Sequence, residues 1–105
     1  MNYNRTKLSC SDPRMLQRII GKCELKSYDG TVQIEKDAAH LMTRGLPHTT
    51  LLKISRANKD LIFTAEYSFD CENYATTYVV KYKNGRSRQV AVIDNALAYL
   101  ETNIV

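Results

Sequence analysis

The sequence contains no tryptophan, only two prolines and four glycines, and no long uninterrupted apolar run. Neither of the glycine patterns that cradle the phosphates of nucleotides occurs, which excludes the common phosphate-binding loops. No apolar stretch approaches the roughly 20 residues that a membrane-spanning helix needs, so we expect no membrane span. The first ten residues are polar. We therefore expect neither a signal peptide nor a transit peptide, and a cytoplasmic location.

Cysteine and histidine are scarce and poorly spaced for a site. Cys10, Cys23 and Cys71 are odd in number and have no close pair, which is a poor disulfide framework. With His40 and His48 they show no zinc-ligand spacing. No nucleophile or metalloprotease motif occurs either. We therefore expect no metal, no cofactor and no catalytic residues, and an enzyme is the least favoured of three functional hypotheses.

The composition that remains is typical of a small globular protein. With 105 residues, 44% of them hydrophobic and 25% charged, the chain suits one domain that buries a core without disulfides or metal. The formal net charge is +4, from 15 Lys and Arg against 11 Asp and Glu. This mild excess permits nucleic-acid binding but does not by itself argue for it. We expect a single domain over residues 1–105.

The N-terminal part of the chain predicts a strand followed by a helix. Residues 3–10 alternate weakly between apolar and polar side chains. Ser11 or Asp12 can cap the helix, and Pro13 suits its first turn, where the missing N–H costs nothing. An apolar stripe at helical spacing follows, and Gly21 is placed to end the helix.

Three further helical segments are expected. Asp37 can cap a short helix that holds the apolar residues of 38–42 and ends at Gly45. Residues 49–58 fit a helix capped by either of two threonines at its start, and a strand is the alternative. Asp94 can cap a last helix whose apolar residues pack inward.

The first of two predicted hairpins lies within residues 23–36. Asp29 and Gly30 favour a type I′ turn, which matches the twist of paired strands. A two-residue turn at this point pairs Leu25 with Ile34 and places both on the buried face. The other face is polar.

Strands also dominate the C-terminal half. Residues 61–69 predict a strand, because from Phe63 onwards apolar and aromatic side chains alternate with Thr64, Glu66 and Ser68. Residues 74–83 and 86–93 form a second hairpin around Asn84 and Gly85. The expected fold is therefore α+β: a mostly antiparallel sheet with turns at 29–30 and 84–85, packed against two to four short helices.

The helix-like LLKISRANKD, the strand LIFTAEYSF, a short acidic loop and the turn-containing TTYVVKYKNGR follow one another along the chain. In this pattern, residues 50–86 resemble a ferredoxin-like domain family of small phage and plasmid proteins of unknown function. The resemblance covers about a third of the chain. It implies an origin in a mobile element and no particular chemistry.

The second hairpin carries the best candidate for a functional surface. Its two-residue turn pairs Lys83 with Arg86 and Lys81 with Arg88, so the four cations project from one face at the tip. No acidic residue lies between positions 74 and 93. Such a cluster attracts phosphates or carboxylates.

Three tyrosines, Tyr74, Tyr78 and Tyr82, follow at period two on the opposite face. Tyrosines beside cations can stack on nucleic-acid bases or anchor a protein interface. In the alternative interpretation, Tyr74 and Tyr78 belong to the core and the cations only keep a sheet edge soluble.

These features favour a non-catalytic protein that binds a partner with an acidic surface through Lys81, Lys83, Arg86, Arg88 and Tyr82. A compact phage or mobile-element inhibitor of a host defence system, such as an anti-CRISPR protein, fits the small size, the missing catalytic motifs and the resemblance. Such a protein acts in the host cytoplasm. The alternative is a small basic nucleic-acid-binding module that uses the same hairpin.

Overall fold

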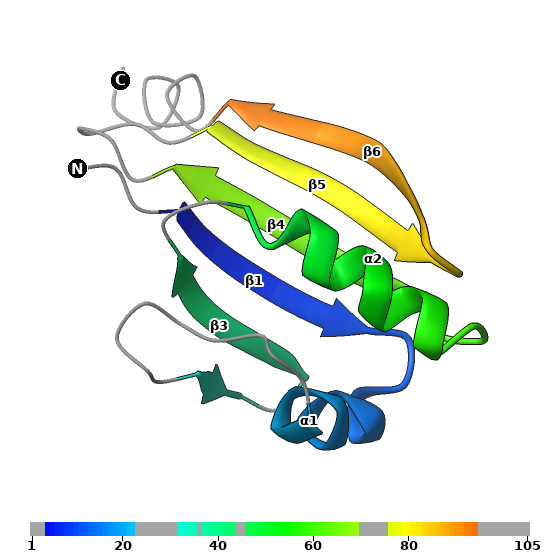
Figure 1. Ribbon diagram of the computed structural model, residues 1–105. Coiled ribbons are helices and arrows are strands. Elements are labelled where there is room, and N and C mark those ends of the chain that lie inside the picture. Colours follow the sequence, from blue (N-terminus) through cyan, green and yellow to red (C-terminus); the bar gives the residue numbers. More distant parts are fainter. Residues whose placement is uncertain (1–3, 23–31, 36, 44–45, 70–75, 95–105) are drawn as a thin grey trace.

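The computed structural model describes residues 4–22, 32–35, 37–43, 46–69 and 76–94. These residues form a six-stranded antiparallel sheet and two helices, which confirms the predicted α+β class (Figure 1). The elements are, in chain order, β1 (Asn4–Cys10), α1 (Pro13–Lys22), β2 (Gln33–Ile34), β3 (Ala38–Thr43), α2 (His48–Ala57), β4 (Phe63–Phe69), β5 (Thr76–Lys83) and β6 (Arg86–Asp94).

The strands are arranged in the order β2-β3-β1-β4-β5-β6, and every neighbouring pair is antiparallel. Strands β1 and β2, joined through α1, therefore run parallel with β3 between them. Strands β3 and β4, joined through α2, run parallel with β1 between them. This double split β-α-β connectivity is ferredoxin-like. The β5–β6 hairpin extends the sheet beyond β4.

The connectivity and the family resemblance concern different parts of the chain. The two split units are built from β1 to β4. The resemblance to phage and plasmid proteins covers residues 50–86, which include most of α2 and all of β4 and β5. The topology therefore does not test that resemblance, which stays a prediction.

Both helices lie on the same face of the sheet (Figure 1). The core lies between the helices and this face of the sheet. Helix α1 contacts β1 and β3, whereas α2 contacts β5 and β6. The largest fully buried apolar and aromatic side chains come from strands and helices alike: Leu8, Leu16, Leu51, Phe63, Tyr67 and Tyr82. We call the opposite side of the sheet the open face, because no helix of the described residues covers it.

The start of α1 is held by the two residues predicted to cap it. The Asp12 carboxylate accepts a hydrogen bond from the backbone N–H of Arg14 at 3.2 Å. The Ser11 hydroxyl instead accepts the backbone N–H of Ile62 at 2.9 Å, which ties the helix start to the segment before β4. The helix continues through Gly21 to Lys22, so the predicted end at Gly21 is too early. One glycine weakens a helix by only about 1 kcal/mol, which the buried residues of the preceding turn can offset.

The predicted helix at 38–45 is wrong, because Ala38–Thr43 form the strand β3. Its local pattern fits a helix, but β3 pairs with β2 on one side and with β1 on the other. Ala39 and Leu41 face the core and are buried. Hydrogen bonds to two neighbouring strands therefore outweigh the local preference.

The first predicted hairpin is only partly described. Its turn at Asp29 and Gly30 and its residue Leu25 lie outside the described residues. Ile34 lies in β2 and pairs with Ala39, and 40% of its surface is exposed. The prediction that Ile34 is buried is wrong, because β2 is the outer described strand and α1 packs on β1 and β3.

The other predictions for the C-terminal half are confirmed where they can be tested. Residues 48–57 form a helix and not a strand, although α2 begins after Pro47 without a side-chain cap from either threonine. Strand β4 and the β5–β6 hairpin occur at the predicted positions. The predicted helix after Asp94 lies outside the described residues.

Candidate protein-binding surface

The turn of the β5–β6 hairpin fixes the direction of its charged side chains. Asn84 has φ 49° and Gly85 has φ 75°, which is the left-handed pair that a type I′ turn requires. The register is as predicted, with Lys83 opposite Arg86 and Lys81 opposite Arg88. We call these four residues the basic hairpin tip. All four side chains are exposed.

The cations of the tip lie on the open face. Strand β5 alternates between buried Tyr82, on the helix-covered face, and its exposed neighbours Lys81 and Lys83. Lys81 lies opposite Thr64 of β4, and Thr64 lies opposite Ser9 of β1. The neighbours of the tip across the sheet are therefore neutral.

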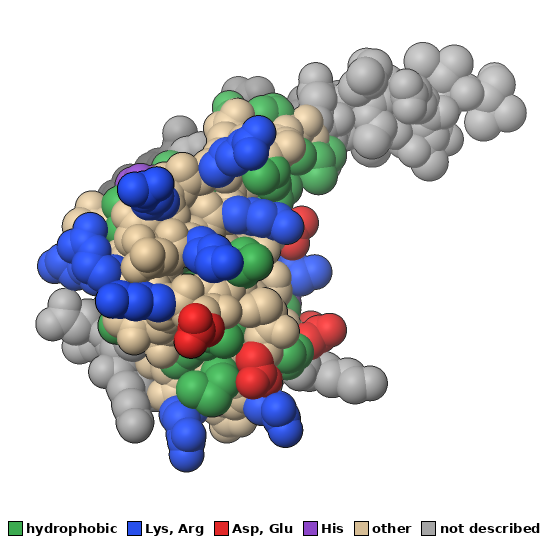
Figure 2. Space-filling model, turned by 90° about the vertical axis from the view of Figure 1, so that its right-hand side faces the viewer, with side chains coloured by type: hydrophobic (Ala, Val, Ile, Leu, Met, Phe, Trp, Pro, Cys, Tyr) green, Lys and Arg blue, Asp and Glu red, His purple; other side chains and the backbone are tan. Residues whose placement is uncertain are grey.

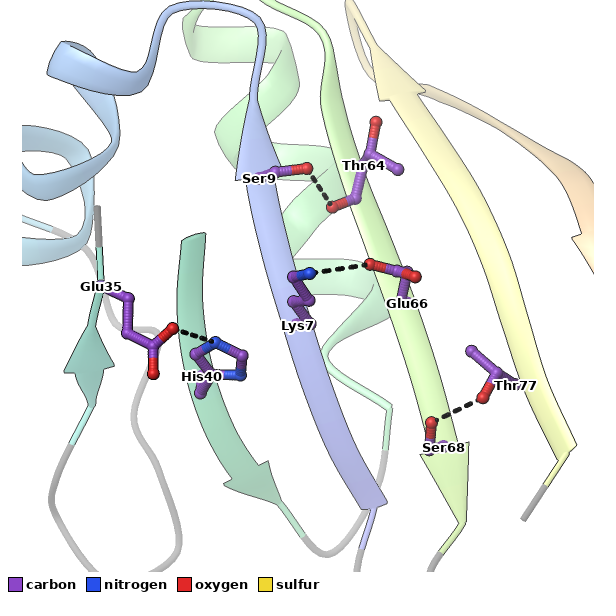
Figure 3. Close-up of polar contacts among 8 residues, drawn as sticks. All are labelled: Lys7, Ser9, Glu35, His40, Thr64, Glu66, Ser68 and Thr77. Carbon is purple, nitrogen blue, oxygen red and sulfur yellow. Dashed lines mark hydrogen bonds and ion pairs between the residues drawn. The ribbon is translucent and has the colours of Figure 1, made fainter. Parts of the chain in front are cut away.

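The acidic residue that β4 places on the open face already has a partner. Glu66 of β4 forms an ion pair with Lys7 of β1, with 3.9 Å between Oε2 and Nζ (Figure 3). Other contacts in Figure 3 link neighbouring strands, such as the 2.9 Å bond between the hydroxyls of Ser68 and Thr77. Among the described residues, none of the four cations of the tip has an ion-pair partner. Within the described ranges, no acidic side chain therefore offsets their positive charge.

Figure 2 views the molecule from the end that carries the hairpin tip. Lys and Arg side chains gather over the hairpin and the adjoining end of α2, and most of the acidic side chains in this view lie below them, towards α1. Arg56 lies in the last turn of α2. Its guanidinium lies so near Gly85 that a Cβ at this glycine would come within 2.7 Å of Nε.

The tip is anchored to α2 by a buried serine. Ser55 has no exposed surface. Its hydroxyl donates to the carbonyl of Leu52 at 2.9 Å and accepts the backbone N–H of Gly85, also at 2.9 Å. The turn is therefore fixed relative to the helix, and the four cations are presented from a supported loop.

The prediction that Tyr82 belongs to a binding surface is wrong, because its side chain is 0% exposed. Its hydroxyl lies 2.6 Å from the Tyr67 hydroxyl and 2.8 Å from Nδ1 of His48. Both hydroxyl protons are used when Tyr67 donates to Tyr82 and Tyr82 donates to Nδ1. Tyr78 also lies on the helix-covered face, where it packs against the core, and Tyr74 lies outside the described residues.

Burial governs the ionisation of the two linked tyrosines. It raises the pKa of Tyr67 above its ordinary value, and the hydrogen bond and charge of Tyr82 raise this pKa further. Burial also raises the pKa of Tyr82, although the hydrogen bond from Tyr67 lowers it in part. Both groups therefore stay neutral phenols over the physiological range.

A hollow of about 290 Å³ lies beside this chain of hydrogen bonds. It is lined by Leu46, His48, Tyr67, Tyr78, Val80 and Gln89. Nδ1 of His48 and the hydroxyl of Tyr67 are already engaged by the hydroxyl of Tyr82. The arrangement does not bring together a nucleophile, a base and an orienting group, so we assign it no chemistry.

Other chemical features can be stated for the described ranges alone. They contain no group of three or more His, Cys, Asp or Glu side chains that could hold a metal ion. Cys10 is a buried free thiol. No described helix is both long and apolar enough to cross a membrane.

Comparison with protein-family models, with curated proteins and with solved structures found no match to this chain. Any functional statement therefore depends on the surface itself.

Sequence reasoning found the four cations of the tip but missed what holds them. The contact between Ser55 and Gly85 joins residues 30 positions apart, and neither residue carries a signal for it. The burial of Tyr82 depends on Tyr67 and His48, which lie 15 and 34 positions away. The only sequence signal for this burial was the spacing of the tyrosines, which places them on one face of a strand and so allowed them to be core residues.

Proposed function

We propose that the protein is a non-catalytic binding protein and that its basic hairpin tip binds an acidic surface of a partner protein. One observation carries the proposal: four exposed cations lie on one face without an ion-pair partner among the described residues. Like charges directly opposite each other in a sheet are destabilising, so their pairing has a cost that a bound anionic group would relieve.

The side chains around the tip favour carboxylates over nucleic-acid bases as the bound groups. The described tyrosines and Phe63 all lie on the helix-covered face. Open-face neighbours of the tip are short and neutral, such as Thr64 and Ser9. Proteins that bind single strands stack bases on exposed aromatic side chains. We therefore favour an acidic protein surface.

The biological setting that we propose is inhibition of a host defence system by a protein from a phage or another mobile element, as anti-CRISPR proteins do. The small size of the chain and the resemblance of residues 50–86 support this setting. In it, the tip occupies an acidic surface of the host machinery and blocks that surface.

The test is affinity capture from host lysate with two charge-reversed variants. Lys83→Glu with Arg86→Glu reverses two charges at the tip, and Arg14→Glu with Arg18→Glu makes the same change in charge on the exposed side of α1. We expect the tip variant to lose the specific partner by about tenfold or more, because wrong-sign contacts cost several kcal/mol. The α1 variant should retain the partner. Equal recovery by both variants would overturn the proposal.

The second candidate function is nucleic-acid binding, which the same four uncompensated cations favour. Its signature is salt dependence: about four phosphate contacts predict a log–log slope of affinity against salt near −3 to −4. If the protein binds a labelled oligonucleotide only weakly at low salt, this candidate function is wrong. Binding with the steep slope, lost in the tip variant, would replace the protein partner with a nucleic acid.

A further inference from the structure

The outer side of β6 is a free sheet edge in the described part of the chain. Strand β6 is nine residues long and pairs with β5 on one side, and it is the last strand in the sheet order. The opposite edge, β2, has only two residues. Because an edge strand presents unpaired N–H and C=O groups, β6 can accept one more strand.

Strand β6 has two chemically different halves. Its half nearest the turn carries Arg86 and Arg88, and its other half exposes Val90, Val92 and Ile93 at 47%, 52% and 43%. Proteins usually blunt a free edge with charge, proline or a β-bulge. The second half of β6 has no charge or proline before Asp94, and its one irregularity is the register shift opposite Val79 and Val80.

The two-residue turn determines which backbone groups of β6 point outward. In such a hairpin the residues that flank the turn, Lys83 and Arg86, exchange both backbone hydrogen bonds, and Lys81 with Arg88 repeats this before the register shift at Val79 and Val80. Arg86 and Arg88 therefore direct their N–H groups to β5. Ser87, which lies opposite Tyr82, directs its N–H to the free edge.

We propose that the acidic partner binds as an extended strand added to the free edge of β6. This inference depends on the proposed function and specifies how the partner is held. Directly opposite residues of neighbouring strands lie about 5 Å apart, so acidic residues at two alternate positions of the added strand would lie beside Arg86 and Arg88. Two adjacent apolar residues further along would cover Val92 and Ile93, which lie on opposite faces of the sheet.

Charge favours this occupant over a second copy of the chain. A second β6 would bring two more arginines and no acidic residue before Asp94. An acidic and apolar strand complements both halves of the edge, whereas an antiparallel second copy would offer its two arginines only one acidic residue, Asp94. Backbone hydrogen bonds give such strand addition its affinity, and side chains give it specificity.

The probe is a synthetic nine-residue peptide, blocked at both ends, with glutamate at two alternate positions near one end and valine at two adjacent positions near the other. Threonine fills the remaining positions, and binding is measured by fluorescence anisotropy. Two further peptides carry backbone N-methyl groups, one on each alternating set of residues. Only one set of N–H groups can face β6. We therefore expect one methylated peptide to lose at least tenfold in affinity and the other to bind as the parent does.

On the protein, Ser87→Pro removes the outward N–H but leaves the bonds to β5, and proline is tolerated on edge strands. We expect Ser87→Pro to weaken peptide binding at least tenfold and Ser87→Ala to leave it unchanged. No binding of the parent peptide, or equal binding of both methylated peptides, would overturn strand addition. So would a dimer of the free protein that Ser87→Pro converts to a monomer.

The two proposals fail in different ways. If Lys83→Glu with Arg86→Glu abolishes peptide binding while methylation and Ser87→Pro do not, the tip binds acidic groups by side chains alone and the edge plays no part. If N-methylation of the peptide weakens binding but Lys83→Glu with Arg86→Glu does not, the edge pairs with added strands irrespective of their charge. In that second case the proposed function is wrong.

Discussion

Ser55 ties the turn of the hairpin to α2, although it is a small residue near the end of this helix. Its hydroxyl is the described partner of the Gly85 N–H, and the residue is fully buried. A buried N–H that loses its partner costs about 1 to 3 kcal/mol, more than the net gain from the bond itself. One oxygen atom therefore joins the turn of the basic hairpin tip to α2.

Ser55→Ala is expected to lower the free energy of unfolding by about 1 to 3 kcal/mol, measured by urea denaturation. Ser87→Ala is the matched control, because this serine is exposed on β6, and exposed substitutions usually change stability by less than about 0.5 kcal/mol. Equal stability of the two variants would mean that water replaces the hydroxyl at Gly85.

The linked tyrosines make stability depend on alkaline pH. Burial raises the pKa of both Tyr67 and Tyr82 above the ordinary value of 10.0. In the unfolded chain they ionise near the ordinary value, whereas in the folded chain they stay neutral. Their contribution to stability is therefore complete below about pH 10 and is lost as the pH rises from there towards the folded pKa values.

Above pH 10, each tyrosine should reduce the free energy of unfolding by up to about 1.4 kcal/mol per pH unit. Denaturation midpoints measured from pH 8 to pH 11 should therefore fall steeply at the upper end. Tyr67→Phe or Tyr82→Phe should remove about half of this slope, and the double variant most of it. A slope that both variants leave unchanged would assign the alkaline transition to other groups.

At the scale of the element, the β5–β6 hairpin owes its shape to its turn. Gly85 has φ 75°, a conformation that costs about 1 kcal/mol or more for a residue with a Cβ. The added Cβ would also meet the Arg56 guanidinium, which is the end of a flexible side chain and can move aside. Backbone strain is therefore the larger part of the cost.

Gly85→Ala should destabilise the protein by about 1 to 2 kcal/mol, measured by thermal or urea unfolding. Asn84→Gly is the control, because Asn84 has φ 49° and glycine adopts this region without strain. We expect this second variant to lie within about 0.5 kcal/mol of the parent. A larger loss in Asn84→Gly than in Gly85→Ala would contradict the type I′ assignment.

Elements with local causes could be predicted from the sequence, and those with distant causes could not. Strand β4 follows from strict alternation, and the second hairpin follows from Asn84 and Gly85. Strand β3 was missed because its apolar spacing also fits a helix, and only pairing with β1 and β2 decides between them. The candidate site shows the same division. The alternation of side chains along a strand predicted which face carries the cations, whereas only the packing of α2 against the hairpin buries Tyr82 and supports Gly85.

At the scale of the whole molecule, the hairpin is an extension of the double split β-α-β unit that shares its core. Tyr82 of β5 lies opposite Phe63 of β4, and both side chains are 0% exposed. The core cluster runs without interruption from Leu8 in β1 to Tyr82. The hairpin therefore cannot leave the sheet without exposing side chains on which β4 also packs.

We expect β5 to unfold only with the whole domain. In native-state hydrogen exchange, backbone amides of β5 that bond to β4 should show the same opening free energy as those of β1, within about 1 kcal/mol. A lower value for β5 alone would make the hairpin a separate unfolding unit. The same experiment tests the free edge: the Arg88 amide should be protected, because it faces β5, whereas the Ser87 amide should exchange almost freely. Protection of Ser87 in the isolated protein would mean that the edge of β6 is already occupied, and an added partner strand would then have no place to bind.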